Sequence, residues 1–140
     1  MEYTEKERLM LVDLKQDIND LSKKLLQNTN KLENFDSVIF CQTVTEIQSK
    51  MSTLSSYSSI KNYDLNKIEI YSAKMMRQAM VMNEYRNKDE ILPSGRFLLL
   101  KMYVITFVSV VNSIEWDFHK KRFSINLKEL KFGDIKLPDL

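Results

Sequence analysis

The sequence predicts an all-α fold, a four-helix bundle-like domain with a long N-terminal heptad helix and a short extended or β tail at the C-terminus. Glycine and proline are rare: the 140 residues contain two of each, and none of the four precedes Pro93. All-β chains need glycine for their hairpins and bulges, so this scarcity favours helix. Four long segments also place apolar residues at alternating spacings of three and four, which is the pattern of one helical face. At 44% hydrophobic and 29% charged residues, the chain can form a core of its own.

These patterns predict the boundaries of the helices and of two parts of the chain. The expected helices span residues 5–34, 37–60, 65–89 and 95–120. We expect the helical bundle domain to occupy residues 1–122 and the extended tail to occupy residues 123–140.

The first predicted helix begins at a capping box and continues as a heptad pattern. Thr4 and Glu7 have the spacing at which each side chain bonds the backbone N–H of the other. The heptad positions that follow are apolar except for one asparagine, and they are Leu11, Leu14, Ile18, Leu21, Leu25, Asn28, Leu32 and Phe35. This face either packs within the chain's own domain or forms a seam with another chain, in which case a buried Asn28 would fix the register. As candidate partner-binding residues we take Leu11, Leu14, Ile18, Leu21, Leu25, Asn28 and Leu32.

The second and third predicted helices follow good N-cap residues. Asp36 or Ser37 precedes the second helix, whose apolar face is Phe40, Val44, Ile47, Met51 and Leu54. The Ser-rich run 52–64 predicts a helix end and a loop. Asp64 precedes the third helix, whose apolar face is Ile68, Tyr71, Met75, Ala79 and Met82, widened by Met76 and Met80. A methionine-rich face fills an uneven core or forms an adaptable binding groove, and the sequence leaves both interpretations open.

The stretch "FLLLKMYVITFVSVVNSIEW" at 97–116 is the most apolar part of the chain. A membrane span needs about 20 apolar residues, but Lys101 and Asn112 interrupt this stretch. A strand would need strict alternation, whereas the apolar spacing here is again three and four, at Leu100, Val104, Phe107, Val111, Ile114 and Phe118. We therefore predict the central helix of the bundle, buried on most sides, and no membrane span.

The tail has a different pattern, in which apolar residues occupy alternate positions at Phe123, Ile125 and Leu127 and again at Ile135 and Leu137. This pattern predicts extended structure that lies along the bundle or reaches a neighbour. Within it, the candidate partner contacts are Phe132, Ile135 and Leu137.

The residues that usually perform catalysis or hold metals are scarce. Cys41 and His119 are the only cysteine and histidine, whereas zinc sites need several such residues at short spacing. Two isolated glycines cannot form a phosphate-binding loop. We expect no enzyme activity, no catalytic residues, no cofactor and no metal. A single cysteine excludes an intrachain disulfide, and "MEYTEKER" lacks the features of a signal peptide, so we expect a reducing, cytoplasmic location.

One cluster of aromatic and basic residues at 116–123 suggests a second function. Aromatic rings beside cations can stack on bases and bind phosphates, and the candidates are Trp116, His119, Lys120, Lys121 and Arg122. The net charge of the chain is only +2, which argues neither for nor against an acidic partner.

The scarcity of catalytic and metal-binding residues favours a non-enzymatic protein–protein interaction module. The heptad face of the first helix and the tail support this, because they offer more apolar surface than a single bundle needs. Such a module would be an adaptor, a chaperone-like regulator or an assembly subunit, and it would bind a protein partner or its own copies through helix packing and the tail. The alternative is a small nucleic-acid-binding regulator that uses the patch at 116–123.

Overall fold

The computed structural model describes residues 4–59, 62–114, 117–118 and 137–138, and these residues are almost entirely helical. The four α-helices are α1 (Glu5–Asn28), α2 (Ser37–Ser55), α3 (Asn62–Asn87) and α4 (Ser94–Ser113). A short 3-10 helix, η1 (Leu32–Asn34), lies between α1 and α2. Strands β1 (Ser58–Ser59) and β2 (Asp117–Phe118) form one antiparallel pair of two residues each. The predicted all-α chain with four helices is confirmed, whereas the predicted tail, apart from 137–138, lies outside the described residues.

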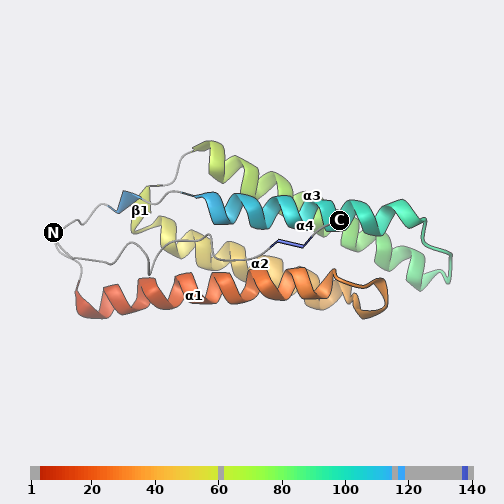
Figure 1. The fold of residues 1–140 in the computed structure, drawn as a ribbon, viewed down its shortest axis with the longest axis horizontal. Helices are drawn as coiled ribbons and strands as arrows, with labels where there is room; N and C mark the ends of the chain where they lie inside the picture. The colour runs from red at the N-terminus through yellow and green to blue at the C-terminus, as the bar shows by residue number, and fades with distance from the viewer. Residues whose placement is uncertain (1–3, 60–61, 115–116, 119–136, 139–140) are drawn as a thin grey trace.

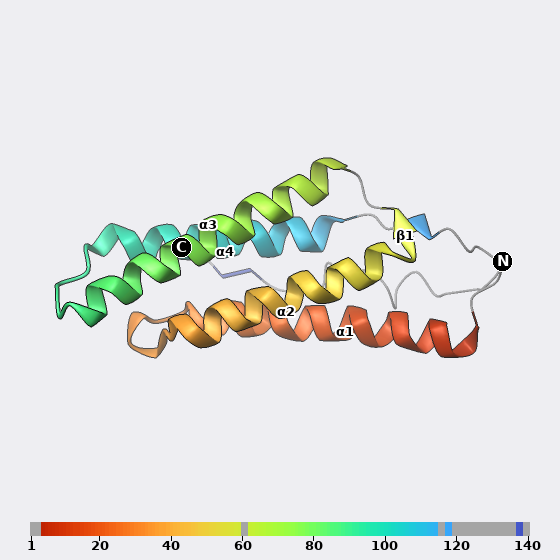
Figure 2. The same ribbon diagram turned by 180° about the vertical axis from the view of Figure 1, so that it is seen from behind.

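The helices form two antiparallel hairpins that pack on each other as a bundle. Helix α1 runs along α2, and α3 runs along α4 (Figures 1 and 2). Between the hairpins, α2 contacts α3 more extensively than α1 contacts α4. The loops 29–36 and 88–93 lie at one end of the molecule, and the β1–β2 pair lies at the other (Figure 1).

The predicted starts of α1 and α2 are confirmed by their caps. The hydroxyl of Thr4 accepts a hydrogen bond from the Glu7 N–H at 3.0 Å, and the Glu7 carboxylate accepts one from the Thr4 N–H at 3.1 Å. The carboxylate of Asp36 accepts bonds from the N–H groups of Val38 and Ile39. Each cap pairs backbone donors that have no partner inside the helix, and a cap of this kind contributes about 1 kcal/mol.

The predicted ends of α1 and α2 are wrong, because both helices end earlier than the apolar pattern indicated, and a hydroxyl side chain bonds a carbonyl of the last turn at each end. Helix α1 ends at Asn28 and not at residue 34, and the Thr29 hydroxyl donates to the carbonyl of Leu25 at 2.9 Å. Helix α2 ends at Ser55 and not at residue 60, where the Ser56 hydroxyl donates to the carbonyl of Thr53 at 2.6 Å. Such local bonds satisfy the last carbonyls of a helix without a further turn.

The predicted bounds of α3 and α4 also need correction. Helix α3 begins at Asn62, so Asp64 lies in its first turn and not at its cap. The helix ends at Asn87, and Asp89 then adopts a left-handed backbone with φ 54°. Helix α4 ends at Ser113 and not at residue 120, because the backbone of Ile114 is extended.

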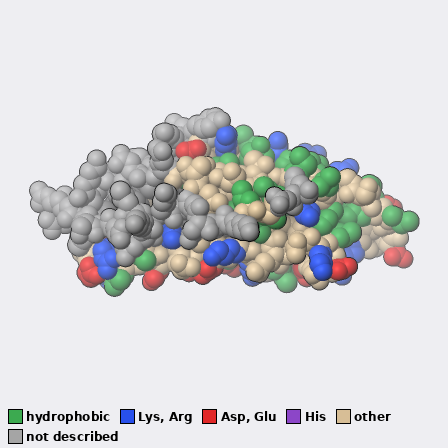
Figure 3. All heavy atoms as spheres, viewed as in Figure 1, with side chains coloured by type: hydrophobic (Ala, Val, Ile, Leu, Met, Phe, Trp, Pro, Cys, Tyr) green, Lys and Arg blue, Asp and Glu red, His purple; other side chains and the backbone are tan. Residues whose placement is uncertain are grey.

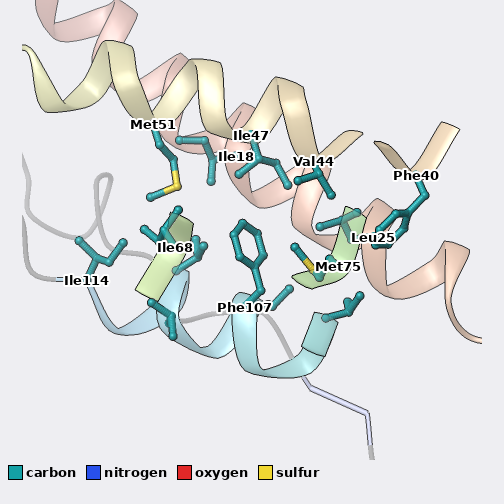
Figure 4. Close-up of a cluster of buried hydrophobic side chains, with 14 of the residues drawn as sticks. Ile18, Leu25, Phe40, Val44, Ile47, Met51, Ile68, Met75, Phe107 and Ile114 are labelled. Atoms are coloured by element: carbon teal, nitrogen blue, oxygen red, sulfur yellow. The ribbon is translucent and has the colours of Figure 1, made fainter. Parts of the chain in front are cut away.

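The core lies between the two hairpins and contains side chains from all four helices. Its largest fully buried rings are Phe40 of α2 and Phe107 of α4. Phe107 points from α4 toward Ile47 and Ile18 in the opposite layer (Figure 4). Fully buried aliphatic and thioether side chains surround these rings, among them Leu11, Ile18, Leu25, Val44, Ile47, Leu54, Met75, Leu100 and Val104.

The buried line of α1 differs from the predicted heptad line at every second position. Leu11, Ile18 and Leu25 are buried as predicted, but the buried positions that alternate with them are polar: Lys15, Ser22 and, just after the helix, Thr29. Leu14 and Leu21 are only partly buried against the core. They share a helix face with Asp17, which forms an ion pair with Lys50 of α2 at 3.1 Å. The face formed by Leu14, Asp17 and Leu21 therefore lies at the edge of the α1–α2 contact. The polar residues Lys15, Ser22 and Thr29 are buried more deeply.

On α3, too, a polar residue is buried at a position beside the predicted apolar one. Ser72 occupies the fully buried position where the pattern had placed Tyr71, which is partly buried. Met75 and Met82 fill the core, Met76 is partly buried, and Met80 is 62% exposed. The core interpretation is confirmed for Met75 and Met82, and the binding-groove interpretation stays a prediction.

Candidate interaction surfaces

The predicted partner seam on α1 lies mostly inside the chain's own core. Leu11, Ile18 and Leu25 are fully buried by the chain's other elements, so they are not accessible to a second chain in this structure. Leu32, in η1, is half exposed, and it is the most accessible apolar member of the seam.

Asn28 is the last residue of α1 and is partly buried. Its side-chain nitrogen Nδ2 is buried without a hydrogen-bond partner among the described residues. The polar position of the heptad pattern therefore coincides with the end of the helix. Its predicted role in fixing the register between chains stays a prediction.

One predicted tail contact, Leu137, meets the bundle at the α1–α4 seam. Leu137 is partly buried against the core, and Pro138 beside it is exposed. The two residues border a cavity of about 280 Å³, whose other lining includes Leu26 of α1, Thr29 just after it, and Lys101 and Ile105 of α4. The other two predicted tail contacts, Phe132 and Ile135, lie outside the described residues.

The aromatic and basic patch predicted for nucleic acid also lies outside the described residues. None of its candidates, Trp116, His119, Lys120, Lys121 and Arg122, belongs to the described part of the chain. The nucleic-acid interpretation stays a prediction from the sequence.

Helix α4 exposes apolar side chains that the sequence pattern had placed among buried ones. Leu98 is 49% exposed and Met102 is 46% exposed, and they lie one helical turn apart. Phe97, Leu99 and Ile105 are partly buried beside them. Figure 3 shows hydrophobic side chains gathered over the N-terminal half of α4. The sequence did not indicate which side of α4 is exposed, because apolar residues occur all around the helix and no polar row marks the side that faces water.

The same apolarity makes α4 comparable to a membrane helix. Among the described helices it alone is long and apolar enough to cross a bilayer, with a mean hydropathy of 1.5 over its most apolar window and 33% of that window buried. The core helix of a soluble protein meets the same criterion. The expectation that the chain has no membrane span stays a prediction.

Two observations concern metal binding and thiol reactivity in the described residues. Among them, no three His, Cys, Asp or Glu side chains are grouped so that they could hold a metal ion. Cys41, the only cysteine, is partly buried on α2, and burial raises the pKa of its thiol. A thiol with a raised pKa is mostly neutral at pH 7 and is a poor nucleophile.

Comparison with known proteins gives no relative for this chain. A scan against protein-family models, a search of curated proteins and a search of solved structures each found no match.

Proposed function

We propose that this chain is a non-enzymatic protein–protein interaction module, such as an adaptor, a chaperone-like regulator or an assembly subunit. The observation that supports the proposal is the exposed apolar face of α4, formed by Leu98 and Met102. Adjacent apolar side chains that stay exposed commonly mark a surface that another protein covers.

The physical properties of this face suit a protein partner. Fully burying one leucine or methionine side chain contributes about 1.5–3 kcal/mol, so covering two half-exposed ones gives a useful part of a binding energy. The flexible Met102 thioether can adapt to the shape of the partner. Lys101 lies between Leu98 and Met102 in the sequence. Its Nζ atom is 5.8 Å from the centre of the Phe97 ring, so a cation borders the apolar face.

The tail adds a second component to the proposed surface. Leu137 contacts the bundle near Ile105, which lies on α4 close to the exposed pair. An extended segment that rests on this seam would border any partner bound to α4. We therefore assign the interaction to α4 together with the tail, and a second copy of the chain is one possible partner.

The proposal is tested by removing the apolar face without changing the core. In the double variant Leu98→Gln and Met102→Gln, both new side chains are good helix formers and both positions are at the surface. We expect the variant to keep its helical circular dichroism and to weaken association by about tenfold. Sedimentation equilibrium measures association between copies, and affinity capture from the native host measures association with other proteins.

A matched control separates this face from a general loss of apolar surface. Leu9 on α1 and Ile70 on α3 are exposed to a similar degree, so the double variant Leu9→Gln and Ile70→Gln removes comparable surface elsewhere. We expect this control to associate as the parent does. Equal association of both double variants, or recovery of the parent in a carbonate-resistant membrane pellet, would contradict the proposal. Binding to DNA or RNA that falls steeply with salt would instead favour the nucleic-acid alternative.

A further inference from the structure

A second surface lies between α2 and α3, the two helices nearest the viewer in Figure 2. There the beginning of α2 and the end of α3 border an open groove of about 980 Å³. Val38 and Met80 face it from the two helices and are 63% and 62% exposed. Cys41 also lines the groove, and its thiol is uncharged at pH 7, because burial raises a pKa that already lies above neutrality. These three side chains form an apolar floor, and Ser37, Gln42, Thr45 and Asn83 also line the groove.

The rim of this groove is acidic. Glu46 of α2 and Glu84 of α3 line it, and both are exposed. A second groove continues around the end of the bundle and shares Ser37 and Asn83 with the first. Its charged lining residues are four carboxylates and one guanidinium: Glu33, Asp36, Asp89, Glu90 and Arg86.

The two adjoining grooves thus concentrate negative charge on a chain that is slightly basic overall. Among the described residues, six carboxylates and one guanidinium line them, while the net charge of the whole chain is +2. Asp36 also caps α2, so part of its charge is offset by the start of that helix. Glu33 lies in the first turn of the short η1, whereas the other four carboxylates lie at no helix start. A surface with one dominant sign attracts a partner of the opposite sign and raises its association rate.

We propose that the α2–α3 groove binds an amphipathic helix of a partner protein, one whose apolar row is flanked by lysine or arginine. Helices bind apolar grooves through residues spaced three and four apart, and the apolar floor formed by Val38, Cys41 and Met80 suits such a row. The carboxylates of Glu46 and Glu84, on opposite helices, suit cations on both sides of that row. The inference adds a partner class to the proposed interaction function, but it uses a surface separate from α4.

A second copy of the chain suits the groove less well. The first helix illustrates why, because Asp13, Asp17 and Asp20 share it with Lys23 and Lys24. A helix of mixed charge would bring carboxylates toward Glu46 and Glu84. Repulsion between like charges would then oppose docking.

The single cysteine provides a direct reporter of occupancy. We suggest measuring the rate at which a thiol reagent alkylates Cys41 in the full chain, with and without a synthetic helical peptide of about 18 residues, or five turns. The probe peptide places leucine at spacings of three and four and lysine on both flanks. We expect saturating peptide to slow alkylation by about tenfold or more, and we expect added salt to weaken the protection because the flanking charges are screened.

Two further peptides control for unspecific adhesion. One has the same composition in an order that spreads leucine around the helix, and the other has glutamate in place of lysine. We expect neither to protect Cys41. Equal protection by all three peptides, or none by the leucine–lysine peptide, would overturn the proposal. Protection that grows with protein concentration in the absence of peptide would show that a second copy occupies the groove, and would also overturn it.

Variants on α3 test the floor and the rim separately. Met80→Glu and Glu84→Lys change exposed groove residues, and Ile70→Glu and Glu69→Lys make matched changes, apolar to acidic and acidic to basic, on the same helix outside this groove. We expect the first two to raise the peptide dissociation constant by about tenfold and the controls to change it by less than about twofold. The α4 double variant, Leu98→Gln and Met102→Gln, should bind the peptide as the parent does. This last result distinguishes failure of the groove from failure of the α4 surface.

Discussion

Replacing Phe107 with alanine is expected to lower the free energy of unfolding by about 3–5 kcal/mol. Phe107 is fully buried, and its ring lies in the middle of the side chains that join the two hairpins (Figure 4). Removing the ring loses its transfer from water and leaves a cavity that the neighbouring side chains fill only in part. Because small domains are stable by only about 5–15 kcal/mol, this one change would remove a large part of the stability.

Urea denaturation followed by circular dichroism measures the change. Leu98→Ala on the same helix is the control, because Leu98 is half exposed and has less contact to lose. We expect its cost to be about 1 kcal/mol or less. A loss below about 1 kcal/mol for Phe107→Ala would show that α4 does not insert this ring between the hairpins.

On α1, Leu25→Ala is expected to cost about 2–5 kcal/mol and Leu21→Ala roughly half as much. Leu25 is fully buried, whereas Leu21 is partly buried at the edge of the α1–α2 contact. The two substitutions remove the same atoms from the same helix, so the difference between them reports burial alone. Matched urea denaturation curves of the two variants provide the measurement.

The heptad pattern predicts a different result for Leu21→Ala and Leu25→Ala. In that pattern Leu21 and Leu25 occupy equivalent seam positions, so their replacement by alanine should have similar costs. Equal losses would therefore support the heptad line and contradict the buried line through Lys15, Ser22 and Thr29.

The class of fold and the starts of α1 and α2 could be predicted because their causes are local in the sequence. The three-and-four spacing reflects the geometry of a single helix, and it predicted all four helices. The capping residues Thr4, Glu7 and Asp36 bond backbone groups within three positions of themselves. Because these interactions join residues that are close in the sequence, they can be predicted from the sequence.

The end of α1 could not be predicted because the apolar spacing continues beyond the helix. Leu32 and Phe35 extend the pattern of three and four, but both lie after the helix has ended. Phe35 reaches the bundle from the loop, where its ring lies 5.5 Å from that of Phe40 and 6.4 Å from that of Phe97. Tertiary contacts, and not a continuing helix, explain why this position is apolar.

The surfaces were still harder to predict, because exposure depends on how the helices pack. Leu98 and Leu100 are both leucines on α4, yet the first is half exposed and the second is fully buried. The α2–α3 groove joins Val38 with Met80, which lie far apart in the sequence. The sequence indicated a methionine-rich face, but it could not indicate that Met80 would be mostly exposed beside a groove while Met75 would be fully buried.

The pairing of each helix with its neighbour along the chain affects how the molecule folds. The closest contacts join α1 to α2 and α3 to α4, and each pair is connected by a short loop, 29–36 or 88–93. Closing a short loop loses little chain entropy, so either hairpin can form before the rest of the chain is ordered. Chains dominated by such local contacts refold in about microseconds to milliseconds, and stopped-flow measurement of the main refolding phase would check this. A main phase of seconds would mean instead that the search for the α2–α3 contact, the step that joins the hairpins, limits the rate. In either case a nascent chain could order its first hairpin before the residues of its second were available.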